Sequence, residues 1–140
     1  MRKKENQQNN YIYLSGSIIN DTFVSELKKY NISFRRKVIY QTILKKSLNR
    51  NTIKILKQNK ITGVVFYSKT ATDVYFKLLK KYKISIATLQ QKYFALSPRI
   101  AEHCKKYKIK QGVIKISAEP DQTSMLSLIV ANKQLINIEK

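Results

Sequence analysis

The sequence predicts an α/β fold, with a mostly parallel sheet of about five strands and helices on both faces. Short apolar runs end in small or hydroxyl-bearing residues at four places, and a helical pattern of apolar residues follows each of them. Strands that alternate with helices form parallel sheets, because each helix returns the chain to the edge where the next strand starts. Ligands of such sheets gather at the carboxyl ends of the strands, where helix amino termini offer free N–H groups to anions. The turns after these runs are therefore the expected site for an anionic ligand.

Five strands are expected, at residues 11–14, 33–43, 63–67, 93–96 and 113–117. In the second of them, Phe34, Val38 and Tyr40 share one face. The run at 63–67 is nearly all apolar, as is typical of a central parallel strand.

The helices are predicted from residues that recur at helical spacing. The first places Phe23, Val24, Leu27 and Tyr30 on one face, and Asn31 follows where a left-handed residue commonly ends a helix. A second helix is expected over 51–59. The strongest pattern covers 70–82, where the apolar residues are Ala71, Val74, Tyr75, Leu78, Leu79 and Tyr82.

Two more helices complete the alternation. Ser97 is expected to cap a helix that has Pro98 in its first turn, and Cys104 lies on the apolar side of that helix. The last helix opens at Asp121 or Thr123, and its apolar stripe is Met125, Leu128 and Ile129. Residues 1–10 are polar and aperiodic, so a disordered basic and polar tail is expected there.

Composition limits the classes of function. A net charge of +20 would suit a polyanionic partner, but 23 of the 28 basic residues are lysines scattered along the chain, which also fits a compositional background. No apolar run approaches the roughly 20 residues that span a membrane. With Cys104 as the single cysteine, no internal disulfide is possible and a cytoplasmic, reducing location is expected. His103 cannot form a metal site alone.

Three stretches carry a resemblance to a known family. Residues 11–16 (YIYLSG), with Asp21, Leu27, Asn31 and the run 38–42 (VIYQT), resemble a strand–glycine–helix unit and the VYxT strand that follows it. Residues 64–68 (VVFYS) resemble the end of a further strand, and 94–101 (FALSPRIA) with 118–120 (AEP) resemble the closing turn and helix. In this order and at this spacing, they resemble the carboxy-terminal half of the uroporphyrinogen-III synthase family.

The resemblance implies an activity and a domain organisation. The family closes linear hydroxymethylbilane into uroporphyrinogen III, inverting one pyrrole ring and losing water, in tetrapyrrole and haem biosynthesis and without a cofactor or metal. Residues 11–40 would correspond to part of the family's middle domain and 41–140 to most of its terminal domain. The family's earlier half has no counterpart here. A Gly and a Thr of its Gly-Pro-x-Thr turn are replaced by Ser97 and Ile100.

The resemblance also implies site residues. Tyr40 matches the family's tyrosine and is the candidate proton donor, because a phenol can donate a proton while it is neutral at pH 7. The candidate substrate-binding residues lie in the turns, namely Ser15, Gly16, Ser68, Lys69, Thr70, Ser97 and Arg99.

Each candidate also has a purely structural interpretation. Tyr40 would be a strand residue that packs its ring, and Ser68 and Ser97 would be plain helix caps. Lys69 would be a solvated surface charge, whereas Arg99 has the forked geometry that suits a carboxylate.

The leading interpretation is therefore a uroporphyrinogen-III synthase-type enzyme, or a truncated form of one, acting on the anionic small molecule hydroxymethylbilane. One alternative is a non-catalytic α/β remnant, or a subunit that needs a separate chain supplying the amino-terminal half. A further alternative is a basic nucleic-acid-binding module, which the sequence disfavours because it contains no recognition motif or clustered basic helix.

Overall fold

The computed structural model describes residues 11–19, 21–110 and 112–138, so the predicted tail at 1–10 lies outside the described residues. The chain divides into two compact units, Met1–Leu44 and Lys45–Lys140, which are described separately. The first unit contains β1 (Tyr11–Gly16), α1 (Asp21–Lys29) and β2 (Phe34–Tyr40). The second contains α2 (Arg50–Lys57), β3 (Gly63–Phe66), α3 (Lys69–Lys81), η1 (Ile86–Thr88), β4 (Lys92–Ala95), α4 (Pro98–Cys104), η2 (Lys105–Tyr107), β5 (Ile114–Ile116) and α5 (Gln122–Ile138).

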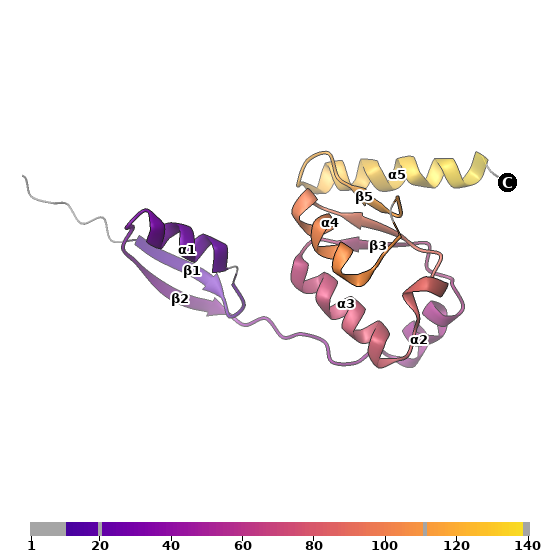
Figure 1. The fold of residues 1–140 in the computed structure, drawn as a ribbon, viewed down its shortest axis with the longest axis horizontal. Coiled ribbons are helices and arrows are strands. Elements are labelled where there is room, and N and C mark those ends of the chain that lie inside the picture. Colours follow the sequence, from indigo (N-terminus) through magenta and orange to yellow (C-terminus); the bar gives the residue numbers. More distant parts are fainter. Residues whose placement is uncertain (1–10, 20, 111, 139–140) are drawn as a thin grey trace, which may run out of the picture. The chain divides into compact units, whose positions relative to one another are not determined.

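The predicted fold class is confirmed, because strands alternate with helices and every strand pair is parallel (Figure 1). The five strands form two sheets, with β1 beside β2 in one and the order β3-β4-β5 in the other. The expectation of a single sheet of about five strands is therefore wrong, because the alternation of elements predicts parallel pairing but carries no information on which strands share a sheet.

The core of the second unit lies between one face of its sheet and helices α3 and α4. Phe66 of β3 and Tyr93 of β4 have stacked rings with centroids 6.0 Å apart, and Phe76 of α3 contacts both rings. Leu79 and Cys104 complete this layer and are buried. α5 lies on the other side of the sheet, so helices cover both faces (Figure 1).

The structure corrects one expectation about the sheet of the second unit. The predicted central strand was 63–67, but β4 is central and β3 lies at the edge of the described sheet. Three consecutive residues of β4, Tyr93 to Ala95, are buried, whereas Val65 of β3 is exposed. Both runs are apolar, and apolar composition alone does not separate a central strand from an edge strand that a helix covers.

The first unit packs more loosely. Tyr13 of β1 contacts Phe23 of α1 and Phe34 of β2 edge-on, and these rings form its small apolar layer. In contrast, Ile12, Leu14 and Ile39 are each more than half exposed. As expected, Asn31 ends α1 in the left-handed region, with φ of 53°. An isolated pair of strands is marginally stable in water. Because this unit also buries few apolar side chains, we expect it to have little stability of its own.

Within the described residues, no helix is both long and apolar enough to cross a membrane.

Candidate functional site

The turns after the three strands of the second unit lie along one edge of its sheet. Phe66 of β3 is paired with Ala95 of β4, and Ala95 is paired with Ile116 of β5. Ser68 and Ser97 follow two residues after the first two of these positions, and Ser117 follows directly after the third. The register therefore brings Ser68 and Ser97 to the carboxyl edge, as predicted from the sequence.

Ser68 is a helix cap. Its hydroxyl oxygen accepts a hydrogen bond from the Ala71 amide at 3.0 Å, and its carbonyl accepts from the Thr72 hydroxyl at 3.0 Å. The structural interpretation of this serine is therefore observed directly. A cap does not exclude a ligand, because Lys69 and Thr70 occupy the first turn of α3, where backbone N–H groups point out of the helix.

Ser97 occupies the capping position of α4 but makes no capping hydrogen bond from its side chain. Its backbone is extended, with φ of −151° and ψ of 160°, and Pro98 starts the helix. Arg99 follows in the first turn and is exposed. Ile100, which replaces the family's Thr, is buried in the core and does not contribute to this edge.

The remaining predicted residues, Ser15, Gly16 and Tyr40, meet at the end of β1 in the first unit. The register of the strands shifts between Ser15 and Gly16, so that Gly16 is paired with Tyr40. A side-chain carbon built on Gly16 would lie only 2.4 Å from Cε2 of Tyr40. The glycine therefore lets the Tyr40 ring lie directly against the backbone of β1. Despite this contact, Tyr40 is 61% exposed, so a bound molecule could reach it.

Sequence reasoning missed Arg36, which fixes this strand end. Its Nε donates to Ser15 Oγ at 2.9 Å, and its Nη2 donates to the carbonyls of Gly16 at 2.8 Å and Ser17 at 3.2 Å. Ser17 Oγ in turn accepts from the Thr42 amide at 2.9 Å. The available signal was a run of three basic residues, 35–37, inside a predicted strand, because an arginine there can donate to several carbonyls at once.

One buried polar side chain lies at this edge, that of Ser117, which is 4% exposed and whose Oγ has no hydrogen-bond partner among the described residues. The buried titratable groups of the second unit lie in its core. Burial raises the pKa of the Tyr93 hydroxyl to about 12 and also raises that of the Cys104 thiol. The Tyr75 hydroxyl donates to Gln91 at 2.6 Å, and burial raises its pKa strongly. Within the described residues, no group of three His, Cys, Asp or Glu side chains is placed to hold a metal ion.

The two capping serines give a direct comparison of roles. We expect Ser68→Ala to lower the free energy of unfolding of the second unit by about 0.5–2 kcal/mol, because it removes a formed capping bond. We expect Ser97→Ala to change it by less than about 0.5 kcal/mol, because no such bond is made. Urea unfolding of both variants measures the difference. Equal losses would show that Ser97 also stabilises its helix through its side chain.

These observations define a class of protein: a parallel α/β protein with hydroxyl groups and helix amino termini at the carboxyl ends of its strands, the usual ligand edge of such sheets. A family model described as uroporphyrinogen-III synthase HemD matches residues 1–127. The chain belongs to this family, and the resemblance noted in the sequence is confirmed.

One similar solved structure is the crystal structure of uroporphyrinogen-III synthetase from Helicobacter pylori 26695. It shares 19% sequence identity with this chain at a TM-score of 0.62, and the match covers 87% of this chain and 53% of that chain. The chain therefore spans about half the length of this relative, and at this identity the likeness supports the fold alone. No curated protein matches the chain.

Proposed function

We propose that the protein acts as a uroporphyrinogen-III synthase, closing hydroxymethylbilane into uroporphyrinogen III with inversion of one pyrrole ring and loss of water. The match of the family model to residues 1–127 is the observation that carries this proposal. The placement of the candidate residues at strand ends, where α/β proteins bind ligands, is consistent with it.

In this proposal, Tyr40 is the proton donor. Loss of the substrate's hydroxyl group as water leaves an azafulvene cation, and a positioned acid lowers the barrier to that departure. Tyr40 is suited to this role in two respects: its ring is held against Gly16, and its exposure leaves it open to a substrate. Arg36 acts as a positioning residue, because its three hydrogen bonds hold the strand end on which the Tyr40 ring rests.

The substrate's carboxylates are the proposed ligands of the remaining strand-end residues. In the second unit these are Ser68, Lys69, Thr70, Ser97 and Arg99, which combine two positive charges with the amino termini of α3 and α4. In the first unit they are Ser15 and Gly16. A flexible polyanion needs to be held in one conformation before its ends can join, and such positioning can supply a large part of the rate acceleration.

A second possibility is favoured by the exposed apolar surface of the first unit. Ile12, Leu14 and Ile39 are each more than half exposed on a two-stranded sheet. We propose that a further α/β segment covers this surface, supplied by a separate chain or by another part of the same protein. In that case this chain is one part of the active enzyme.

The test is an assay with hydroxymethylbilane that separates the type III product from type I, which forms without an enzyme. We expect little type III product from the chain alone and recovery when the amino-terminal half of a family member is added, because that half covers the exposed sheet. In the active preparation, Arg99→Ala should raise KM by about 5–150-fold, as expected for a lost bond to a charged group. Lys54→Ala, on an exposed position of α2, is the matched control. If neither preparation forms type III product, the proposed enzyme function is wrong.

A further inference from the structure

A large cavity lies in the second unit, away from the strand-end residues. It has a volume of about 740 Å³ and is bounded by the later turns of α3, the segment 84–86 and η2. This volume falls within the range of about 300–1,000 Å³ that is typical of small-molecule sites. The lining residue nearest to the strand ends along α3 is Asp73, three residues after Thr70. None of the candidates Ser68, Lys69, Thr70, Ser97 and Arg99 lines the cavity, so its lining is distinct from that of the proposed catalytic edge.

The floor of the cavity is apolar and well packed. Leu79, Phe76 and Ile84 line it, and all three belong to the buried core. The ring of Tyr107 stacks on that of Phe76, with centroids 4.2 Å apart and planes inclined by 20°. Phe76 itself is only 3% exposed, so the partly exposed ring of Tyr107, held against it, and the partly exposed Ile86 are the apolar groups that a ligand would contact.

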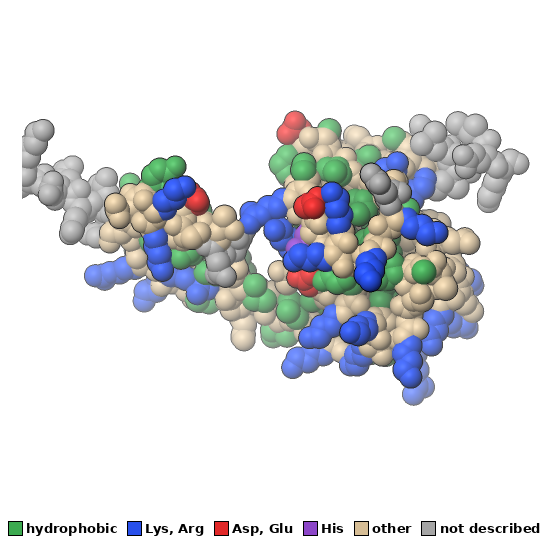
Figure 2. Space-filling view, viewed as in Figure 1, with side chains coloured by type: hydrophobic (Ala, Val, Ile, Leu, Met, Phe, Trp, Pro, Cys, Tyr) green, Lys and Arg blue, Asp and Glu red, His purple; other side chains and the backbone are tan. Residues whose placement is uncertain are grey.

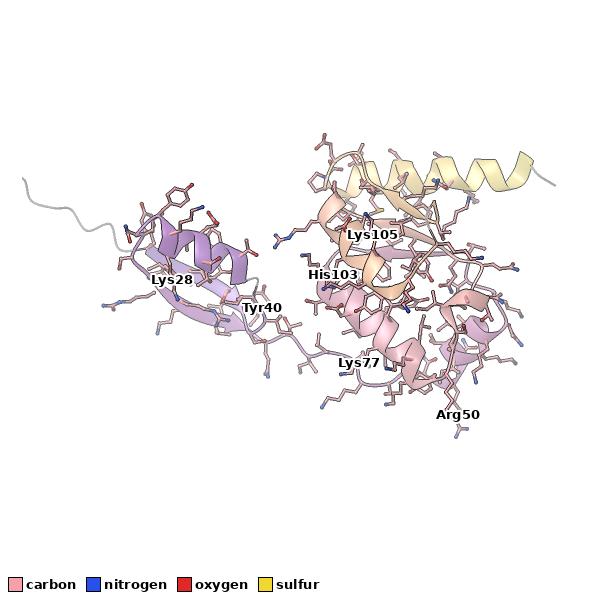
Figure 3. All side chains as sticks on the ribbon, viewed as in Figure 1. Lys28, Tyr40, Arg50, Lys77, His103 and Lys105 are labelled. Carbon is pink, nitrogen blue, oxygen red and sulfur yellow. The ribbon has the colours of Figure 1, made fainter. Side chains whose placement is uncertain are left out.

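Four lysines surround this floor. Lys77 and Lys80 come from α3, and Lys106 and Lys108 come from η2 and the residue that follows it. All four are exposed, and none of them forms an ion pair within the described part of the chain. Figure 3 labels Lys77 on α3. Lysine stems cover apolar surface while the charged ends move, so the rim can adjust to an anion.

Asp73 is the one carboxylate that lines the cavity, and one of its two oxygens already has two hydrogen-bonding neighbours. Nε2 of His103 lies 2.6 Å from Asp73 Oδ1, and the Tyr107 hydroxyl donates to the same oxygen. Although partial burial pushes the pKa of Asp73 upward, the contacts with Tyr107 and His103 and the nearby charge of Lys106 hold it below its usual value. With four lysines against one engaged carboxylate, the field in the cavity is positive.

We propose that this cavity binds an amphipathic organic anion, with an apolar or aromatic body against Tyr107 and Ile86 and an acidic group among the four lysines. Inorganic phosphate would make no contact with these two partly exposed apolar side chains, and a neutral apolar molecule would make no use of the lysines. A ligand with both an apolar body and an acidic group would contact the apolar side chains and the lysines together.

The probe is 8-anilinonaphthalene-1-sulfonate, an aromatic anion whose fluorescence rises in apolar surroundings. We expect one molecule to bind per chain, with an affinity that falls as salt is raised from 50 to 500 mM because exposed charges are screened. The neutral analogue N-phenyl-1-naphthylamine should bind more weakly, and inorganic phosphate at equal concentration should not displace the probe. In methyl NMR spectra, the probe should shift Ile84 and Ile86, which line the cavity, and leave Ile116 of β5 unchanged.

A double variant and a matched control test whether the lysines of the cavity contribute to binding of the probe. Lys77→Gln with Lys80→Gln should weaken binding of the probe by about fivefold, since each exposed charge contributes modestly. Lys54→Gln with Lys57→Gln removes the same charge at the same spacing from exposed positions of α2 and should have no effect. Thermal unfolding of both double variants establishes that the fold is kept. Equal weakening in the two pairs, salt-independent binding, or probe shifts confined to residues outside the cavity would overturn the proposal.

Discussion

Tyr40→Phe is expected to lower the kcat for type III product by about 10²–10⁴-fold, the usual effect of losing a positioned acid. The substitution removes one hydroxyl from a ring that is 61% exposed, so the packing against Gly16 is kept and the fold should not change. The KM should change little, because in this proposal the hydroxyl acts on the departing group and not on the carboxylates. The measurement uses the preparation shown to be active in the hydroxymethylbilane assay.

Two further variants make this result specific. Tyr30→Phe removes a hydroxyl from another exposed tyrosine of the first unit and should leave kcat unchanged. Gly16→Ala keeps the hydroxyl but places a carbon where the Tyr40 ring lies, so the ring has to move and kcat should fall. An unchanged kcat in Tyr40→Phe would exclude Tyr40 as the proton donor.

Phe66→Ala is expected to lower the free energy of unfolding of the second unit by about 3–5 kcal/mol. Phe66 is 2% exposed and contacts the rings of Tyr75, Phe76 and Tyr93, so its removal leaves a cavity that three aromatic neighbours line. This is a large part of the 5–15 kcal/mol that stabilises a typical domain. Urea unfolding followed by near-ultraviolet circular dichroism measures the loss, because that signal depends on packed aromatic rings.

The control for this prediction is the preceding residue of the same strand. Val65 is 38% exposed on the opposite face of β3, and Val65→Ala should cost about 1 kcal/mol or less. Similar losses in the two variants would contradict the assignment of the core to the α3 side of the sheet.

The positive charge of the chain remains consistent with a compositional background. On the face shown in Figure 2, lysines and arginines are scattered among polar and apolar side chains in both units. Arg36, by contrast, has specific partners, because it donates hydrogen bonds to the predicted site residues Ser15 and Gly16. A count of charges therefore says less about function than the partners of individual side chains.

The sequence by itself determined the class of fold, the order of its elements and the family. Apolar residues at helical spacing predicted the helix at 70–82, observed as α3 (Lys69–Lys81), and Asn31 marked the end of α1. The motifs around Ser15, Ser68 and Ser97 were enough to identify the family. These properties are local, because periodicity, capping and turn chemistry act over a few consecutive residues.

Tertiary structure alone decided which strands pair, which strand is central and which side chains meet. β4 is central and β3 is at the edge, although both runs are apolar. The contact of Gly16 with Tyr40 depends on a shift in strand register, and the hydrogen bonds of Arg36 cross between two strands. The cavity beside Phe76 and Tyr107 likewise joins residues about 30 positions apart in the sequence. Such contacts follow from packing between distant segments, and a pattern within any one segment does not contain them.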